Sequence, residues 1–593
     1  MRGLSPGSRM VRAAAAPLIA GGVMLLLGLV LPPYFQFVGA LAAQQAIIGL
    51  SIGVVYNLAG MVSLAQVSLS AIGAWTAIAV SQSLLPDAYP WTALIAGAVA
   101  VPVGILVGLP ALRLRGISLA IVTLGFVVII YQLSSLGFIP GSSPLDFLSA
   151  PAWTMTNAGF YVIAWTSFTV LAVLFAIVKR TRMGLGWTAV ASSERAAASL
   201  GVGILTAKLT AFGFSAFIAG WGGAVLVAAF GTTNVESFSA ITAMTMFVLA
   251  VMVGAGHWEG ALILGLLGAI VGAVLRQFDL PADLSALIFA VGAIDVLSRG
   301  KGGISVLLRR AARRLRGPRK AASDTSGAPP GSAAAGAEPP GPDGIGGIDF
   351  ETAALEVDGL AVAYGTVKAL DGVSIAIARG EVHGIVGPNG AGKSTFVDAV
   401  TGFIAGCAGH VRVGGCPLDA QTPQARSRLV RRTFQQDRAI AALAPFDYLR
   451  LAGQGRSSDQ EIRELLRWIG CSESALQVED LDTRQRRNLM IAAALAGKPE
   501  VVLLDEPAAG LTEEESVHLT ELVSEMPGRF GVSVGIIEHD LDLVRAVCHR
   551  VTVLDFGRVL STGPTAAVLE EPAVVRAYMG DLDIEPADGG ANA

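Results

Sequence analysis

The sequence predicts a polytopic α-helical membrane domain of about ten spans, followed by a soluble α/β domain built around a phosphate-binding loop. Of the 593 residues, 53% are hydrophobic and only 15% are charged, and the mean hydropathy is +0.61, as in membrane proteins. The apolar residues are concentrated in the N-terminal half, where Asp87 is the only charged residue between Ala14 and Leu112. The region after about Leu355 has a soluble composition and contains the glycine-rich stretch Gly387–Ser394 directly after an apolar run.

Ten apolar stretches in the N-terminal half are long enough to cross a bilayer, which takes about 20 helical residues. They lie near residues 14–32, 37–59, 66–84, 91–110, 117–137, 159–178, 209–230, 238–255, 260–276 and 284–298. The third stretch begins with Gln66, Ser68 and Ser70, so a re-entrant segment is an alternative to a full crossing there.

Positive charges are distributed as a cytoplasmic N terminus requires. Arg113 and Arg115, residues 179–182 and a basic cluster at 309–320 all fall on the cytoplasmic side when ten spans are assumed. We therefore expect a multi-pass protein of the cell inner (plasma) membrane with a cytoplasmic C-terminal domain. By its position, the basic cluster is interpreted as contacting membrane lipid, and no nucleic-acid partner is expected.

Charged groups are rare within the apolar stretches, and Asp295 is nearly the only candidate for binding a coupling ion. A carrier driven by protons or sodium is therefore poorly supported, because such carriers bind the ion with intramembrane carboxylates or histidines. Uncharged polar side chains instead gather around the second and third stretches: Gln44, Gln45, Asn57, Ser63, Gln66, Ser68 and Ser70. They either line a pathway for a small polar solute or pack helices together through hydrogen bonds.

We expect the membrane domain at residues 1–316, a linker at 317–350, the α/β domain at 351–582 and a flexible tail at 583–593. The linker is rich in Pro, Gly and Ala and has no apolar periodicity, so it is predicted to be disordered. The segment Ser193–Val202 is predicted to form a short, serine-capped helix that ends at a glycine. This helix either docks on a cytoplasmic partner or simply connects two spans.

Gly387–Ser394 fits the pattern G-x-x-x-x-G-K-[ST] between an expected strand, Val382–Val386, and an expected helix. A strand, loop and helix in this order direct backbone N–H groups and the positive end of the helix dipole at a bound phosphate. Lys393 is expected to reach the β- and γ-phosphates, and the Ser394 hydroxyl to ligate Mg²⁺. The residues expected to hold the nucleotide here are Gly387, Pro388, Asn389, Gly390, Ala391, Gly392, Lys393, Ser394 and Thr395.

Other segments supply the remaining parts of a phosphate-hydrolysing site. Gln435 is expected to touch Mg²⁺ or the attacking water, and Tyr364 to stack on a purine. Asp505 and Glu506 end an apolar strand, where Asp505 is expected to hold Mg²⁺ through water and Glu506 to polarise the attacking water. His539 ends another apolar strand and is predicted to sense the γ-phosphate, because ligands bind at the carboxyl edge of open α/β sheets.

In this order the motifs resemble those of ABC-transporter ATPases, over about residues 355–580. The narrower similarity is to the ATPase subunit of branched-chain amino-acid importers, carried by Asp505–Leu511, Ile537–Asp540, Val553–Gly557 and Ala577–Gly580. The membrane half is similar to the permease subunit of the same systems, through Asn57–Leu64, Leu112–Ile117, Ala120–Leu124 and Glu194–Gly201. The last of these resembles the coupling helix that enters the ATPase.

The resemblance implies a permease fused to an ABC ATPase that uses ATP and Mg²⁺ to import a small polar solute such as a branched-chain amino acid. It implies that Glu506, His539 and Gln435 act in catalysis, and that Ser394, Gln435 and Asp505 hold the metal, partly through water. It also implies two kinds of partner: a second permease and ATPase half, and an external solute-binding protein.

One stretch departs from the family pattern. Where these ATPases carry a signature close to Leu-Ser-Gly-Gly-Gln, this chain has Leu481-Asp482-Thr483-Arg484-Gln485. An acid near a triphosphate repels it, although Arg484 offsets part of this repulsion. We therefore expect one working and one degenerate ATP site, and a partner half that is a different chain. Thr512 also stands where many relatives have Asp or Asn.

Two alternatives remain open at this point. Related importers carry urea or short amides, and the motifs do not separate these solutes from amino acids. A second class of protein, an ATP-gated or regulatory membrane protein, would use ATP only to set its conformation. The intact Glu506 argues against that class, because a protein that only binds nucleotide has no need to activate water.

Overall fold

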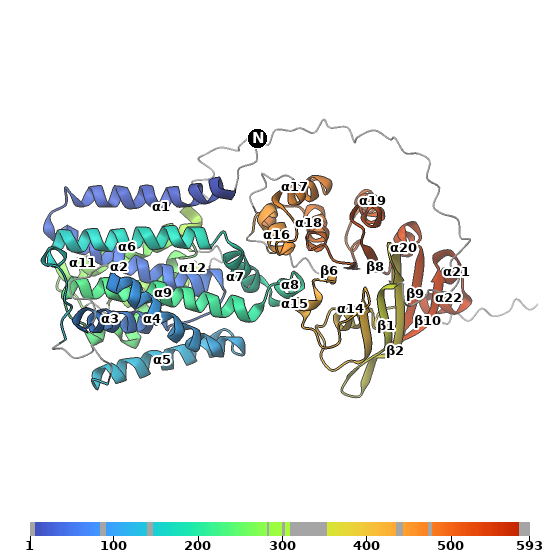
Figure 1. Cartoon of the computed structure of the whole chain (residues 1–593), viewed down its shortest axis with the longest axis horizontal. Coiled ribbons are helices and arrows are strands. Elements are labelled where there is room, and N and C mark those ends of the chain that lie inside the picture. Colours follow the sequence, from blue (N-terminus) through green and yellow to red (C-terminus); the bar gives the residue numbers. More distant parts are fainter. Residues whose placement is uncertain are drawn as a thin grey trace, which may run out of the picture. The chain divides into compact units, whose positions relative to one another are not determined.

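The chain consists of two compact units, Met1–Ser192 with Ile204–Ala321, and Ser193–Gly203 with Ala322–Ala593 (Figure 1). The computed structural model describes residues 6–83, 91–138, 146–281, 284–298, 303–308, 353–434, 440, 443–471 and 477–579. The predicted linker, tail and basic cluster lie outside the described residues, as do the boundaries predicted for the two domains.

The first unit is a bundle of helices, and each of the ten predicted apolar stretches overlaps one long helix (Figure 1). The helices are α1 (Pro6–Gly28), α2 (Pro33–Gly53), α3 (Gln66–Ser83), α4 (Trp91–Gly108), α5 (Ile117–Ser135), α6 (Asn157–Val178), α7 (Arg182–Ser192), α9 (Ile204–Phe230), α10 (Ala240–Val253), α11 (Trp258–Gln277) and α12 (Leu284–Ser298). Short helical segments of other types lie between them: the π-helical η1 (Val54–Leu58), which continues α2, and the 3-10 helices η2 (Leu109–Leu112), η3 (Ala152–Met155) and η4 (Val235–Phe238).

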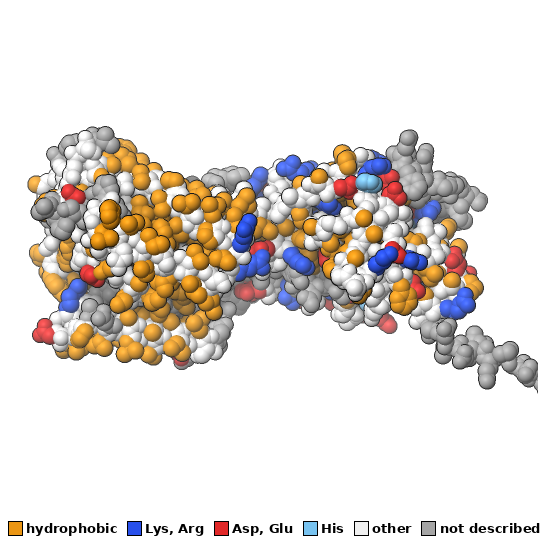
Figure 2. All heavy atoms as spheres, turned by 90° about the horizontal axis from the view of Figure 1, so that it is seen from below, with side chains coloured by type: hydrophobic (Ala, Val, Ile, Leu, Met, Phe, Trp, Pro, Cys, Tyr) orange, Lys and Arg blue, Asp and Glu red, His pale blue; other side chains and the backbone are white. Residues whose placement is uncertain are grey.

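Within the described residues, six helical segments are long and apolar enough to cross a membrane: Pro33–Leu58, Trp91–Leu112, Ile117–Ser135, Asn157–Val178, Ile204–Ala228 and Trp258–Gln277. The apolar parts of α1, α10 and α12 are shorter, and α3 is not among the six. Ten complete crossings therefore stay a prediction. Hydrophobic side chains cover most of the visible surface of this unit (Figure 2), and Ile117 and Val291 are among its exposed large side chains. Such a surface suits lipid contact.

Helix α9 runs through the middle of the bundle and packs against α2, α3 and α4. Small residues allow this close approach, because a Cβ added at Gly73 would lie 2.1 Å from the Gly220 carbonyl oxygen. Polar contacts add to it: the Ser51 and Ser215 hydroxyls are 2.9 Å apart and join α2 to α9. The bundle is thus held by backbone proximity and by paired hydroxyls.

The chain is not helical between α2 and α3, over residues 59–65. This segment is nevertheless largely buried, and its backbone groups find partners inside the bundle. The Met61 N–H donates to the Val55 carbonyl oxygen at 2.9 Å, and the Leu64 N–H donates to Thr123 Oγ1 at 3.1 Å. Irregular backbone at membrane depth is tolerated when protein groups satisfy it in this way.

The second unit contains two sheets and surrounding helices (Figure 1). Its strands are β1 (Ala353–Tyr364), β2 (Val367–Ala378), β3 (Val382–Val386), β4 (Ala408–Val413), β5 (Cys416–Pro417), β6 (Val430–Arg432), β7 (Val501–Asp505), β8 (Ser533–Ile537), β9 (Arg550–Asp555) and β10 (Arg558–Pro564). Its helices are α8 (Glu194–Ser199), α14 (Lys393–Val400), α15 (Pro423–Arg426), α16 (Pro445–Gly453), α17 (Asp459–Trp468), α18 (Thr483–Ala496), α19 (Glu513–Phe530), α20 (Leu541–Val547), α21 (Thr565–Leu569) and α22 (Pro572–Met579), with the turn η6 (Val478–Asp480).

The larger sheet has the order β10-β9-β3-β8-β7-β6, and the smaller antiparallel sheet has the order β2-β1-β4-β5. Strands β3, β6, β7 and β8 run parallel, and every residue of β3, β7 and β8 is buried. This explains their continuous apolar runs, since strands covered on both faces have no polar side. The predicted α/β fold is confirmed.

The predicted short helix is present as α8. Ser193 Oγ accepts a hydrogen bond from the Ala196 N–H at 3.2 Å, and the turn after the helix uses Gly201 with φ +83°. Residues 193–203 belong to the second unit, in which α8 packs beside α15.

The close contact at Gly73 predicts the effect of a single methyl group. Gly73→Ala overpacks the contact between α3 and α9, so the full chain is expected to lose about 1–3 kcal/mol of stability. The matched control is Gly125→Ala, because a Cβ at Gly125 meets nothing within 4 Å. Thermal unfolding of the purified chain in detergent measures both variants. Equal midpoints for the two would contradict the proposed packing.

Candidate functional site

The loop after β3 needs glycine at two positions for steric reasons. Gly387 has φ +149° and Gly392 has φ +99°, conformations that side chains disfavour. A Cβ at Gly387 would lie 2.1 Å from the Leu554 carbonyl oxygen, and one at Gly392 would lie 2.6 Å from the Ala369 carbonyl oxygen. The loop is therefore wound tightly against its neighbours, and α14 begins directly after it at Lys393. The start of this helix provides the N–H groups and dipole that favour an anion.

The Lys393 side chain folds back over the beginning of the phosphate-binding loop. Its ammonium donates hydrogen bonds to the carbonyl oxygens of Gly387 at 2.5 Å and Pro388 at 2.9 Å. Burial lowers the pKa of Lys393, and the carboxylates of Glu506 and Asp505 oppose that shift. The cation is thus placed beside acidic groups in a site that can accept phosphate oxygens.

The other predicted loop residues flank Lys393 in the chain. Asn389 and Gly390 are exposed at the tip of the loop, whereas Ala391 is buried and its carbonyl accepts the Gly557 N–H at 3.1 Å. Ser394 is exposed and Thr395 is half-buried in the first turn of α14. Hydroxyls at the start of α14 are available to a metal ion and to phosphate.

Asp505 ends β7 and is 4% exposed. Its Oδ2 accepts a hydrogen bond from Arg432 Nη2 at 2.8 Å, whereas its buried Oδ1 has no hydrogen-bond partner among the described residues. Burial raises the pKa of Asp505, and the Arg432 guanidinium opposes this shift. An unsatisfied, buried carboxylate oxygen fits a hydrated cation.

The donor set around Asp505 fits Mg²⁺ better than a metal held entirely by protein. Within the described residues there is no cluster of three or more His, Cys, Asp or Glu side chains suited to a metal. Mg²⁺ usually keeps several waters and binds one or two protein oxygens together with substrate phosphates. The Ser394 hydroxyl and the Asp505 carboxylate are the residues that would hold it.

Glu506 has φ +46°, in a region that non-glycine residues rarely adopt. Its N–H donates to the Ile537 carbonyl oxygen at 2.8 Å, which fixes the residue between the ends of β7 and β8. Strained backbone of this kind costs about 1–3 kcal/mol and occurs preferentially at functional sites. Glu506 is therefore held in place by the sheet edge beside Asp505.

The loops after β7 and β8 are joined by a buried carboxylate. Glu538 is fully buried and accepts hydrogen bonds from the Ala508 N–H at 2.8 Å and the His539 N–H at 3.1 Å. The His539 side chain is 59% exposed at this edge, with its Nδ1 3.7 Å from Glu538 Oε2. A histidine that is exposed but anchored through its backbone can contact a bound ligand.

Two predicted residues stand apart from this cluster. Tyr364 ends β1 in the smaller sheet and is 56% exposed. The following strand, β2, reaches the loop through Ala369, whose carbonyl oxygen faces Gly392. Purine stacking by Tyr364 stays a prediction. Gln435 lies outside the described residues, so its predicted roles in catalysis and metal binding stay predictions too.

The sequence analysis missed Arg432 and Asp398. Arg432 ends β6 and is 8% exposed. Its guanidinium pairs with Asp398 of α14 and with Asp505, and its guanidinium carbon lies 4.7 Å from the centre of the Phe434 ring. Buried charges need such pairing. The available signal was an arginine ending a buried strand immediately before Thr433-Phe434, at the same sheet edge as the two acids.

The stretch that replaces the family signature forms the start of α18. Asp482 Oδ1 accepts the Gln485 N–H at 2.7 Å, and Gln485 Oε1 accepts the Asp482 N–H at 3.4 Å, so the two residues form a capping box. Asp482, Thr483 and Arg484 are exposed. The acid therefore stabilises the helix locally and also places negative charge at the surface where this helix begins. Thr512 has a similar local role, since it caps α19.

Each of the two units matches a known protein family. Residues 36–294 match the family model described as the permease component of branched-chain amino acid transport systems. Residues 370–509 match the ABC transporter family model.

Several curated proteins are similar to the C-terminal part of the chain. The high-affinity branched-chain amino acid transport ATP-binding protein LivG of Salmonella typhimurium is 30% identical over 249 residues, which are 38% of this chain and 98% of LivG. BraF of Pseudomonas aeruginosa, with the same description, has the same identity and coverage. The methionine import ATP-binding protein MetN of Caulobacter vibrioides is 34% identical over 38% of this chain and 73% of MetN.

Among solved structures, a nucleotide-free ATP-binding cassette from an ABC transporter aligns with 26% identity and a TM-score of 0.35. The alignment covers 39% of this chain and all of the cassette. A cassette in an ADP conformation has the same identity and TM-score, with 99% of it covered. The chain belongs to the ABC transporters of the branched-chain amino-acid importer family, as a permease domain fused to an ATP-binding domain that couples ATP hydrolysis to transport.

Proposed function

We propose that this chain is one half of an importer for a branched-chain amino acid in the bacterial inner membrane. The observation that carries the proposal is the match of residues 36–294 to a branched-chain amino acid permease, in one chain with an ATPase that is 30% identical to LivG. The MetN similarity concerns the ATPase alone and carries no information on the permease. The other half and an external solute-binding protein are the expected partners.

The ATPase residues have separate tasks in this mechanism. The loop and Lys393 hold the nucleotide phosphates, and Glu506 orients and polarises the attacking water. His539 reports the state of the γ-phosphate from the neighbouring strand. Mg²⁺, held through Ser394 and Asp505, would neutralise negative charge on the phosphates. Lys393 moves from carbonyl partners to phosphate oxygens when nucleotide binds.

The coupling route runs through the segment Ser193–Gly203. It is covalently part of the membrane chain, yet it packs within the ATPase unit, where Arg431 Nη2 lies 3.5 Å from the Leu200 carbonyl oxygen. Closure of two ATPase domains around ATP would move this segment, which α7 directly precedes and α9 directly follows in the chain. The two ATP sites of the complex are proposed to differ, because Asp482 places a carboxylate where the family has a serine.

The proposed role of Glu506 predicts a loss of turnover without a loss of nucleotide binding. Glu506→Gln removes the group that activates water, so ATP hydrolysis by the assembled complex is expected to fall about 100-fold or more. Uptake of leucine into proteoliposomes is expected to stop, while binding of a fluorescent ATP analogue persists. The control is Glu464→Gln, the same change at an exposed position of α17. Wild-type hydrolysis by the Glu506 variant would contradict the mechanism.

The proposed asymmetry predicts that restoring the family signature is harmless. Asp482→Ser together with Arg484→Gly removes the acid and restores close backbone approach, so ATPase activity of the complex is expected to stay equal or rise. Serine also caps helices, so α18 keeps its start. Steady-state phosphate release measures the effect. If the double change abolishes activity, Leu481–Gln485 is a working signature and the asymmetry is wrong.

A further inference from the structure

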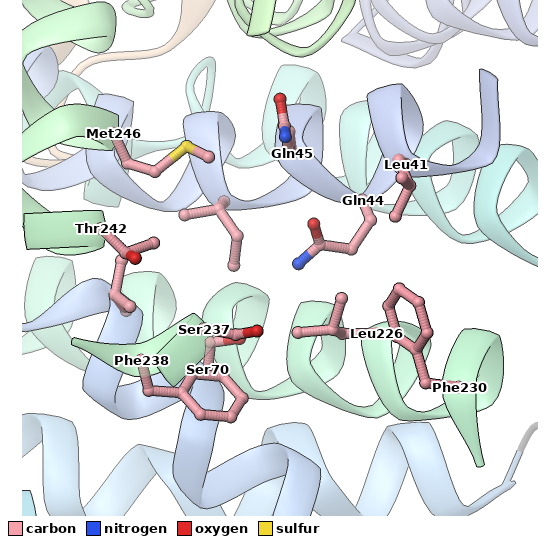
Figure 3. A pocket seen from close by; sticks show the side chains of 12 residues that line it. Leu41, Gln44, Gln45, Ser70, Leu226, Phe230, Ser237, Phe238, Thr242 and Met246 are labelled. Carbon is pink, nitrogen blue, oxygen red and sulfur yellow. The ribbon is translucent and has the colours of Figure 1, made fainter. Parts of the chain in front are cut away.

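The membrane unit contains a cavity of about 280 Å³ between α2, α3, α9, η4 and α10 (Figure 3). Its wall consists of Leu41, Gln44, Gln45, Ile48, Val67, Ser70, Leu226, Phe230, Ser237, Phe238, Thr242 and Met246. The volume is just below the range of about 300–1,000 Å³ typical of pockets for drug-sized ligands, so it suits a smaller molecule. Phe230 ends α9, so the cavity lies toward the end of α9 that is distant from residues 193–203.

Gln44 is the polar group that points into this space. It is 7% exposed, and its amide extends from α2 into the gap beside Leu226 (Figure 3). The amide faces the cavity and is not among the fully enclosed polar atoms that lack a hydrogen-bond partner in the described residues. An amide that faces a cavity completes its hydrogen bonds with water or with a solute inside that cavity.

Gln45, the next residue of α2, has different neighbours from Gln44. Figure 3 shows that Gln45 points away from Gln44, and a Cβ at Gly268 of α11 would lie 2.2 Å from Gln45 Oε1. Ser70 and Ser237 add hydroxyl groups to the cavity wall near Gln44 (Figure 3). One end of the cavity thus offers both donors and acceptors of hydrogen bonds.

The rest of the wall is aliphatic or aromatic. Phe238 is 3% exposed and is held by an edge-on contact with Trp75, at 6.1 Å between ring centres. Ile48, Leu226 and Met246 complete this apolar side. No charged side chain lines the cavity among the described residues. A solute with a net charge would therefore remain uncompensated in a poorly hydrated site.

We propose that this cavity binds the transported solute and that Gln44 is its specificity-determining residue. The ligand class is a small aliphatic α-amino acid in its zwitterionic form. The neutral Gln44 amide donates to the carboxylate and accepts from the ammonium, while Ile48, Leu226, Phe238 and Met246 pack around the side chain. This inference deepens the proposed import function and rests on it for the identity of the ligand.

Direct binding tests the assignment without nucleotide or transport. The full chain, purified in detergent, is expected to bind radiolabelled leucine saturably, and Gln44→Leu is expected to weaken this binding at least tenfold. The matched control is Gln36→Leu, the same change two turns earlier on α2, where the amide donates to the Gly28 carbonyl oxygen outside the cavity. Wild-type affinity in the Gln44 variant would overturn the proposal.

Cysteine protection provides a second measurement that detects weak binding. Ser237→Cys places a thiol on the cavity wall, whereas the four native cysteines all lie after residue 406 and are distinguished by peptide mapping. Leucine at millimolar concentration is expected to slow the labelling of the cysteine introduced at position 237 by a small thiol reagent. Urea, glutamate and lysine at the same concentration are expected to leave the labelling rate unchanged. Protection by urea but not by leucine, or by none of the four probes, would overturn the proposal.

These outcomes separate the cavity from the import function. If leucine protects position 237 but uptake continues with Lys393→Ala, the site stands and the ATP-driven mechanism fails. If uptake needs Lys393 but leucine neither binds nor protects, the importer stands and the cavity assignment fails.

Discussion

Ile385, Ile537 and Asp505 lie side by side in three neighbouring parallel strands, and this alignment brings the ends of β3, β8 and β7 to one edge of the sheet. The phosphate loop, the Asp505-Glu506 pair and Glu538-His539 all follow these ends. A slip of one residue in any strand would turn its side chains to the opposite face. The chemistry of the ATPase therefore depends on register, which the fully buried strands enforce.

A buried network of charge completes this edge. Arg432 pairs with both Asp398 and Asp505, and so links β6, α14 and β7. Without the arginine, two carboxylates would lie beside a site that must also receive a triphosphate. One oxygen of Asp505 nonetheless has no hydrogen-bond partner in the described part of the chain. The network is thus stable enough to hold the carboxylate but leaves it able to bind a hydrated cation.

The uncharged polar residues of the membrane unit have two different uses. Ser51 pairs with Ser215 between α2 and α9, and Gln66 Nε2 of α3 lies 3.5 Å from Ser215 Oγ, so these groups hold helices together. Gln44 and Ser70 instead line a cavity. The packing interpretation of the polar cluster therefore applies to Ser51 and Gln66, whereas a solute pathway at Gln44 and Ser70 stays a proposal. The polar groups on the cavity wall lie beside an apolar surface, as the recognition of an amphipathic solute would require.

The sequence by itself determined the elements whose signals are local. Apolar runs of bilayer length, a glycine-rich loop between strand and helix, and paired acids at a strand end depend on neighbouring residues. The described part of the structure contains the loop, the paired acids and six of the helical segments long enough to span a bilayer. Only the tertiary structure decided what distant segments do together. Arg432 is one of many arginines until β6 aligns it with β7, and Gln44 and Gln45 are equivalent in the sequence. Adjacent residues on a helix point in different directions, and the packing of α2 against its neighbours determines which of the two amides points into the cavity.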